Sequence, residues 1–305
     1  MTLIRKIKKN LEYYSRTAMV YSRDKAYGLH KCQMTRPIFI IGCSRSGTTA
    51  VYKTFSHSRH LASLHKESHE MWDCLHPVSE NNWKSHDLSE KDVKPDDLEQ
   101  ITKFYYSRLG KKQMVDKANQ NCFRIPYLLK LFPDAIFVWV KRSGPDNINS
   151  LIHGWGRPDE YGAWSQDLPA TLGIENGQYT RWCFFLFPGW ENMTHAPIEQ
   201  VCAAQWIAAN QAVLSARSMV PDSQWTEIFY EDVLTDTVET FYQAFKKINI
   251  PFDENMKKFC ATLVQNPYNA FSKPRQDKWK EENPEKIKTI LPTISEMMKQ
   301  MGYRD

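Results

Sequence analysis

The chain has 305 residues, of which 42% are hydrophobic and 25% charged, with a formal net charge of +5. This composition is typical of a globular, soluble protein, and the modest charge suits an anionic cofactor rather than nucleic acid. No apolar run is long enough for a membrane span, and the lysine-rich start lacks the apolar stretch of a secretory signal, so we expect a cytoplasmic protein. The seven cysteines are spread singly, without the spacing of a zinc site.

The first 36 residues predict a basic amphipathic helix. Its apolar positions recur at helical spacing, while lysines and arginines occupy the other faces. These apolar positions are Ile4, Ile7, Leu11 and Tyr14. Packing of this helix on the rest of the chain is the interpretation we favour, and binding to a membrane surface is the alternative. Residues 37–305 are expected to form one domain.

A glycine-bearing loop at 42–49 follows an apolar run at 37–41 and precedes a predicted helix at 48–57. A buried strand, a turn with glycines and a helix N-terminus together direct N–H groups at an anion. The spacing G-x-x-x-x-G matches a nucleotide-binding P-loop, but Thr48 stands where triphosphate enzymes have a lysine. The positive charge comes earlier, at Arg45, which favours a shorter anion. A strand-to-helix turn without a ligand is the alternative.

Strand and helix patterns alternate along the rest of the chain. Strands are predicted at 112–116, 135–140 and 224–229, and helices at 94–110, 125–131, 145–151, 198–219, 232–248 and 284–300. The alternation predicts an α/β fold, a single P-loop-like domain whose central parallel sheet is flanked by helices. Ligands bind such sheets at the carboxyl ends of the strands, where the Arg45 loop, Lys117 and Arg142 should converge.

Two segments interrupt this pattern. Residues 58–94 are polar and irregular, and a long stretch of this kind in a compact domain is often functional. The segment 155–198 is an insertion rich in aromatic residues, which predicts either the wall of an acceptor pocket or a satellite core. Its aromatic residues are Trp155, Tyr161, Trp164, Tyr179, Trp182, Phe184, Phe185, Phe187 and Trp190.

Two motifs in this order resemble the sulfotransferases that use 3′-phosphoadenosine 5′-phosphosulfate (PAPS). Residues 37–49, with their R-S-G-T-T run, resemble the family's 5′-phosphosulfate loop, and 137–142 followed by Ser150 resemble its 3′-phosphate site. Weaker matches are Val115-Asp116-Lys117 with Asn121, Phe229-Tyr230-Glu231-Asp232, and Ser272 with Lys278-Trp279. The resemblance runs from Pro37 to Tyr303.

The resemblance is to the bacterial and tyrosylprotein-type members of that family. No histidine lies between Lys117 and Val140, where the cytosolic phenol and steroid members carry a catalytic one. This branch uses a carboxylate base instead. The chain departs from its E-K-T-P-x-N stretch, because Ala118 and Asn119 replace Thr and Pro.

The resemblance implies PAPS as cofactor, 3′,5′-adenosine bisphosphate as product, and no metal. It assigns cofactor binding to Arg45, Ser46, Gly47, Thr48, Thr49, Arg142, Ser150, Ser272 and Lys278. Trp206 and Tyr230 are candidates for stacking on the adenine, with a place in the core as the alternative.

Catalysis is assigned by the same resemblance to three residues. Arg45 would neutralise charge on the leaving oxygen, Lys117 would contact the transferring group, and Glu67 would act as base. A carboxylate can serve as base if partial burial raises its pKa. The competing candidates for the base are Glu70, His65 and His69.

The function predicted is sulfuryl transfer from PAPS to a hydroxyl, or an amine, of a small-molecule or natural-product acceptor. A P-loop kinase or NTPase is an alternative, opposed by the missing loop lysine and by Lys141-Arg142 where a magnesium-binding Asp is expected. A non-catalytic nucleotide-binding protein is the other alternative. The sequence leaves the acceptor and the oligomeric state open, a homodimer included.

Overall fold

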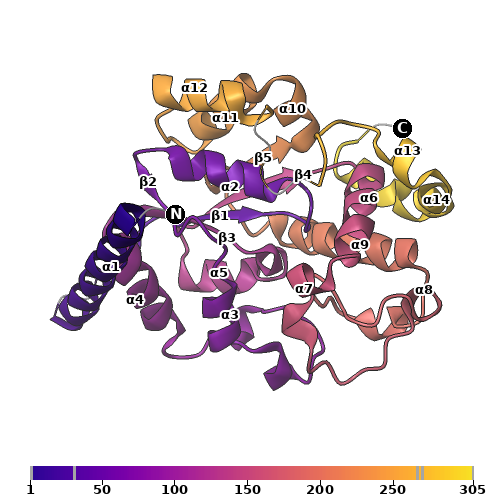
Figure 1. Cartoon of the computed structure of the whole chain (residues 1–305), viewed down its shortest axis with the longest axis horizontal. Helices are drawn as coiled ribbons and strands as arrows, with labels where there is room; N and C mark the ends of the chain where they lie inside the picture. Colours follow the sequence, from indigo (N-terminus) through magenta and orange to yellow (C-terminus); the bar gives the residue numbers. More distant parts are fainter. Residues whose placement is uncertain (1–2, 30–31, 266–267, 269–270, 304–305) are drawn as a thin grey trace.

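Five short apolar segments form the central sheet of the molecule (Figure 1). In the computed structural model, which describes residues 3–29, 32–265, 268 and 271–303, the strands are parallel and lie in the order β2-β3-β1-β4-β5. Their bounds are β1 (Ile38–Ile41), β2 (Leu61–Ala62), β3 (Gln113–Lys117), β4 (Ile136–Lys141) and β5 (Trp225–Phe229). The predicted parallel α/β sheet is confirmed. The strand order places the P-loop strand β1 between β3 and β4.

Helices connect the strands and cover both faces of the sheet (Figure 1). The α-helices are α1 (Leu3–Leu29), α2 (Thr48–His57), α3 (His69–Leu75), α4 (Asp97–Leu109), α5 (Ile125–Leu131), α6 (Gly144–Trp155), α7 (Pro158–Tyr161), α8 (Ile174–Gly177), α9 (Ile198–Arg217), α10 (Tyr230–Thr235), α11 (Thr237–Lys247), α12 (Glu254–Leu263), α13 (Trp279–Glu282) and α14 (Pro284–Gln300). The 3-10 helices are η1 (Val78–Asn81), η2 (Glu90–Asp92), η3 (Asn119–Phe123), η4 (Ala163–Ser165), η5 (Trp190–Met193) and η6 (Asp222–Gln224).

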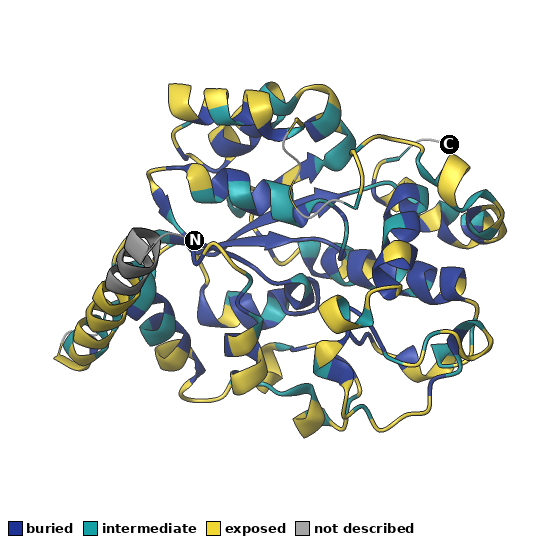
Figure 2. Cartoon of the chain, in the orientation of Figure 1, coloured by how far each residue is buried: buried dark blue, intermediate teal, exposed yellow. Residues whose placement is uncertain are grey.

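Each face of the sheet has its own hydrophobic cluster, because side chains alternate along a strand. Ile38 and Ile40 of β1 pack in one cluster with Phe245 of α11. Phe39 and Ile41 pack in the other, which includes residues of α9 and α14. The central strands are therefore buried on both sides, as Figure 2 shows in dark blue. This explains why their sequences are continuously apolar.

Two segments differ from the sequence-based expectation. The stretch 58–94 contains the edge strand β2 and helix α3, which its polar sequence did not indicate. The helix expected at 232–248 is two helices, α10 and α11, with Asp236 between them. Asp236 has a non-helical backbone, and its side chain accepts the N–H of Glu239, which caps α11. A capping residue inside an amphipathic pattern therefore broke the predicted helix.

The C-terminal part of α1 packs on α4 (Figure 1). Tyr27 is buried, Arg23 Nη1 donates to the carbonyl of Arg108 at 3.4 Å, and Asp24 pairs with Lys103 at 3.3 Å. This part of the helix therefore shows the packing that we favoured.

Of the apolar positions that the sequence indicated on α1, only Tyr14 has a described side chain, and it is not in contact with α4. Tyr14 is 68% exposed, while the side chains of Ile4, Ile7 and Leu11 lie outside the described residues, whose side chains begin at Tyr13. None of the described helices combines the length and the apolar character needed to cross a membrane.

The aromatic insertion does not form the satellite core that was one of its two expected structures, and part of it lines a cavity. Most of its aromatic side chains are buried in the main cluster beneath the sheet rather than in a separate core. These are Trp155, Trp182, Phe184, Phe185, Phe187 and Trp190. Three members, Tyr161, Trp164 and Phe184, line the cavity described below.

Candidate active site

The loop at 42–49 joins β1 to α2 and requires glycine at two positions. Gly42 has φ +156°, and a Cβ there would lie 2.6 Å from the carbonyl oxygen of Val140. Gly47 has φ +96°, and a Cβ there would lie 2.2 Å from the ring of Tyr230. Only glycine allows the loop to lie this close to the end of β4 and to Tyr230.

A cavity of about 850 Å³ opens at the carboxyl ends of the central strands. Because β1 lies between β3 and β4, the loop after β1 has Lys117 on one side and Arg142 on the other. The predicted convergence of these groups is confirmed. The candidate residues that line the cavity are Arg45, Gly47, Thr48, Thr49, Glu67, His69, Lys117, Arg142, Ser150, Tyr230, Ser272 and Lys278.

Thr48 and Thr49 begin α2 and face this cavity. The N–H groups in the first turn of a helix have no partner within the helix, and they carry the positive end of its dipole. The start of α2 is therefore suited to an anion.

Two residues assigned to the cofactor do not line the cavity. The N–H of Ser46 donates to the carbonyl of Cys43 at 3.1 Å, and its hydroxyl is buried against the loop. Trp206 is fully buried in the hydrophobic cluster on α9, where its ring lies against Gly144. The assignment of Trp206 to the adenine is therefore wrong for this conformation, and Ser46 serves the shape of the loop.

Two of the four candidate bases are also outside the cavity. His65 is exposed, with φ +57°. Glu70 is exposed on α3 and pairs with Lys66 at 3.0 Å. Glu67 and His69 both line the cavity, so the geometry reduces the candidates to this pair.

Arg45 and Arg142 lie side by side where β1 and β4 end. Arg142 Nη1 donates to the carbonyl of Arg45 at 2.9 Å. The side chain of Arg45 donates to the hydroxyls of Ser150 at 3.3 Å and Tyr161 at 3.0 Å. Burial, together with the charge of Arg142, lowers the pKa of Arg45 from its ordinary value. No described carboxylate forms an ion pair with Arg142. Two guanidinium groups in one cavity favour a dianionic ligand.

Glu67 is held between Lys117 and His69. Its Oε1 accepts a short hydrogen bond from Lys117 Nζ, and its Oε2 lies 2.6 Å from His69 Nε2. Burial alone would raise the pKa of Glu67, but the charge of Lys117 and the contact with His69 outweigh it and lower the pKa to about 2. The condition for a carboxylate base, a pKa raised by burial, is therefore not met while Glu67 is paired with Lys117. The second ring nitrogen of His69, Nδ1, is buried without a partner.

A buried network beneath this pair was missed in the sequence. Asp116 precedes Lys117 and accepts from the hydroxyl of Ser68, the neighbour of Glu67, at 2.6 Å. Trp72 Nε1 donates to the same hydroxyl at 3.0 Å. The network joins the end of β3 to the start of α3, and it therefore holds Glu67 and Lys117 next to each other. A carboxylate in the last positions of an apolar strand was the available signal.

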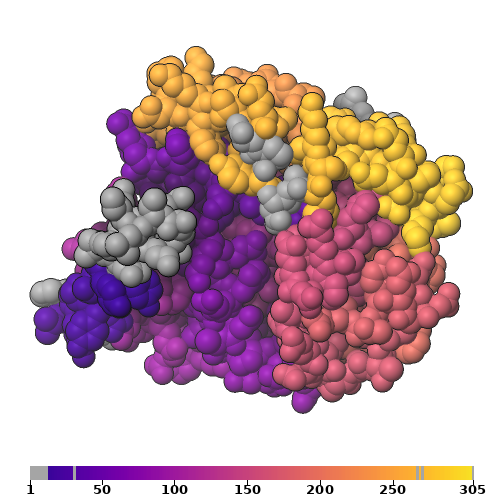
Figure 3. All heavy atoms as spheres, viewed as in Figure 1, coloured from indigo at the N-terminus to yellow at the C-terminus, as the bar shows by residue number. Residues whose placement is uncertain are grey.

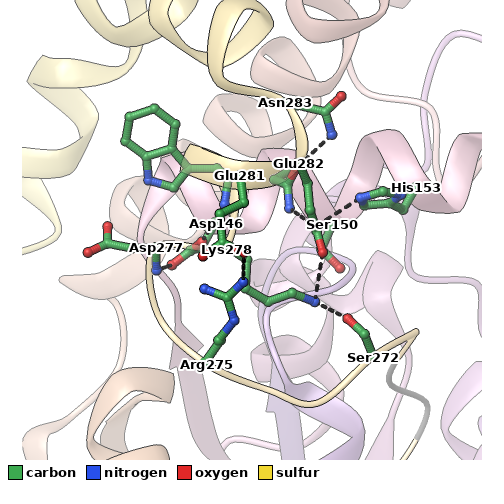
Figure 4. A network of polar contacts seen from close by, with 12 residues as sticks. Asp146, Ser150, His153, Ser272, Arg275, Asp277, Lys278, Glu281, Glu282 and Asn283 are labelled. Atoms are coloured by element: carbon green, nitrogen blue, oxygen red, sulfur yellow. Dashed lines mark hydrogen bonds and ion pairs between the residues drawn. The ribbon is translucent and has the colours of Figure 1, made fainter.

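The C-terminal segment closes the side of the cavity next to α6 (Figure 4). Asp146 accepts the backbone N–H of Asp277 at 2.8 Å, and Glu282 accepts from His153 at 3.0 Å. Lys278 donates to the hydroxyl of Ser272. Ser272 and Lys278 are thereby held in the cavity wall near the helix that carries Ser150.

His86 is a second site residue that the sequence did not single out. It lines the cavity, yet it is only 5% exposed. Its Nδ1 accepts the N–H of Leu186 at 2.9 Å, and its carbonyl accepts from Arg124 at 3.3 Å. Burial, together with the charge of Arg124, lowers the pKa of His86 to about 3. The ring is therefore neutral at physiological pH.

This low pKa predicts a loss of stability in mild acid. Because the folded pKa lies below the unfolded value of about 6.5, the contribution is complete above that pH and is lost as the pH falls towards 3. Between pH 7 and pH 5 the wild type should lose about 2 kcal/mol more unfolding free energy than His86→Asn, whose amide oxygen can replace Nδ1. Urea denaturation at both values measures this difference. Equal losses in the two proteins would contradict it.

Comparison with known proteins identifies the family of this chain. A model described as the sulfotransferase family matches residues 37–254, which is more than half of the chain. The chain belongs to the sulfotransferase family. Sulfuryl transfer is therefore its reaction, and the kinase alternative is set aside. A comparison with curated proteins finds no match to the sequence.

Solved sulfotransferases share the fold at low sequence identity. STF9 from Mycobacterium avium is 14% identical with a TM-score of 0.58, over 95% of this chain and 84% of that one. The sulfotransferase domain from the curacin biosynthetic pathway is 15% identical with a TM-score of 0.50, over 87% and 99%. Mouse SULT7A1, solved with PAP, is 12% identical with a TM-score of 0.50, over 92% and 88%. These likenesses support the sulfotransferase fold.

Proposed function

We propose that this sulfotransferase takes its sulfuryl group from PAPS and transfers it to a hydroxyl or amine of a small-molecule acceptor. The observation that carries the proposal is the adjacent pair Arg45 and Arg142, in the same cavity as the ion pair of Glu67 and Lys117. The two positive charges of Arg45 and Arg142 suit a nucleotide with two phosphate groups. Glu67 and Lys117 supply a carboxylate and an ammonium for sulfuryl transfer.

The residues present fit this nucleotide. The loop with Arg45 and the first turn of α2 would hold the 5′-phosphosulfate, and Arg142 with Ser150 the 3′-phosphate. Tyr230 lies beside the loop at Gly47 and beside Arg142, whose guanidinium carbon is 5.1 Å from the centre of its ring. When bound, PAPS supplies the activated sulfuryl group. Mouse SULT7A1, which shares the fold, was solved with PAP, and this supports the choice of nucleotide.

We assign Glu67 as the base that takes the proton from the acceptor hydroxyl or amine. With Lys117 at Oε1, its pKa of about 2 makes it a weak base. If Lys117 turns away, burial remains and raises the pKa of Glu67. Lys117 is then available to neutralise negative charge in the cavity. His69 keeps Oε2 in place through Nε2, so it is a positioning residue in this scheme.

Thermal-shift titration tests the nucleotide directly. At about a hundred times its dissociation constant, 3′,5′-adenosine bisphosphate should raise Tm by about 5 °C without magnesium. ATP with magnesium should have a much smaller effect, because the loop lacks the lysine at the position of Thr48. Stabilisation by ATP with magnesium and not by the bisphosphate would overturn the proposal.

A further inference from the structure

Several residues that line the cavity have no place in the scheme above, and six of them lie on the side of Glu67 and Lys117. They are Asp73, Trp83, His86, Asn119, Gln120 and Trp164. Asn119 follows Lys117 by two residues, Asp73 lies one turn after His69 on α3, and Trp164 packs against His86. Figure 3 shows the segments around 60–85 (purple) and 155–185 (pink) side by side on this face. An acceptor next to Glu67 would meet these residues.

Two carboxamides on this side have no hydrogen bonds among the described residues. The amide oxygens of Asn119 and Gln120 are buried without partners, although both residues line the cavity. Gln120 is only 5% exposed. Buried amides are normally paired, and leaving one unpaired is costly. The last torsion of an amide side chain is soft, so each group can turn its oxygen or its NH₂ towards a ligand.

His86 adds a fixed donor. Because Nδ1 accepts the N–H of Leu186, Nε2 carries the hydrogen of the neutral ring. Nε2 has no hydrogen-bond partner among the described residues. Asp73 adds a carboxylate to the same wall, and it also makes no hydrogen bond or ion pair within the described part of the chain.

Two tryptophans provide apolar surface between these polar groups. Trp83 has φ +59° and follows Asn82 with φ +57°, and both are unusual for residues other than glycine. The turn is held by the N–H of Trp83, which donates to the carbonyl of Val78 at 3.0 Å, and by its carbonyl, which accepts from Trp190 Nε1 at 2.7 Å. Backbone of this kind is often found at ligand sites. Trp164 lies edge-on to His86 at 5.0 Å.

We propose that the acceptor is a sugar or another polyhydroxylated ring. The apolar C–H face of such a ring packs on an indole, while its hydroxyls donate to Asp73 and the amide oxygens and accept from His86 Nε2. A phenol or an apolar alcohol would fill the same space but leave Gln120, Asn119 and His86 without partners. A site that hydrogen-bonds its substrate discriminates strongly against analogues without those groups.

The proposal rests on the proposed function, so the first measurement is the binding of 3′,5′-adenosine bisphosphate to the full chain. Saturation-transfer NMR with this nucleotide bound then uses methyl glycosides of glucose, galactose, mannose and N-acetylglucosamine as probes, with 4-nitrophenol and cyclohexanol as comparators. We expect contact with at least one glycoside and little with the comparators. No nucleotide binding would argue against the proposed function. Nucleotide binding without any glycoside contact would overturn the acceptor proposal alone.

Gln120→Leu should weaken the binding of the glycoside about tenfold, because one hydrogen bond is lost. It should leave nucleotide binding unchanged. Gln166→Leu is the matched control, since Gln166 is exposed and does not line the cavity. Trp83→Ala is a second variant. Loss of the indole face of Trp83 should also weaken the binding of the glycoside. Glycoside binding that neither Gln120→Leu nor Trp83→Ala changes would contradict the proposal.

Discussion

Replacing Glu67 by glutamine is expected to lower kcat about 10³-fold, because the variant loses the group that takes the acceptor proton. Glutamine keeps the size of the side chain, so the cavity should keep its shape. Binding of 3′,5′-adenosine bisphosphate should be unchanged or tighter, since Lys117 is freed from its ion pair with Glu67. Steady-state kinetics and calorimetric titration measure the two effects separately.

Glu70→Gln is the matched control for this experiment. Glu70 lies three residues further along, outside the cavity, and pairs with the exposed Lys66, so its variant should keep full activity. His69→Gln should lower kcat by only about tenfold and shift the pH profile, because His69 positions Glu67 through Oε2. A complete loss in His69→Gln with normal turnover in Glu67→Gln would show that His69 is the base.

Arg142→Ala is expected to weaken the binding of 3′,5′-adenosine bisphosphate about 100-fold. This is the usual effect of removing one partner of a charged pair, here that of Arg142 and the 3′-phosphate. Adenosine 5′-monophosphate lacks the 3′-phosphate, so the variant should bind it nearly as well as the wild type does. The difference between the two nucleotides isolates the contact of Arg142 with the 3′-phosphate. Calorimetric titration of both nucleotides into the wild type and the variant gives the four affinities of this comparison.

The same four affinities also show whether Arg142→Ala disturbs the loop. Arg142 Nη1 holds the carbonyl of Arg45, so the variant could disturb the loop instead of the 3′-phosphate site. Equal losses for the two nucleotides would show this and contradict the assignment. Arg181→Ala serves as control, because Arg181 pairs with Asp159 at 2.9 Å and does not line the cavity.

Residues at strand ends were predicted well because their positions follow from the order of strands. Arg45, Lys117 and Arg142 each end or follow a strand, and parallel strands place such residues at one edge. Trp206 was misplaced for the opposite reason. An aromatic residue on an apolar helix can face a ligand or the core, and only the packing of α9 on α6 shows that it faces the core.

The sequence by itself determined the parallel sheet, the anion-binding loop and the family resemblance, because these depend on local periodicity, glycine positions and residue spacing. The tertiary structure alone decided which groups are charged, paired or left without partners. Glu67 has a low pKa because Lys117, far away in the sequence, lies against it. Gln120 and His86 became candidates for acceptor binding only when their hydrogen bonds could be followed across the fold. Such properties arise from contacts between distant segments, and no local pattern records them.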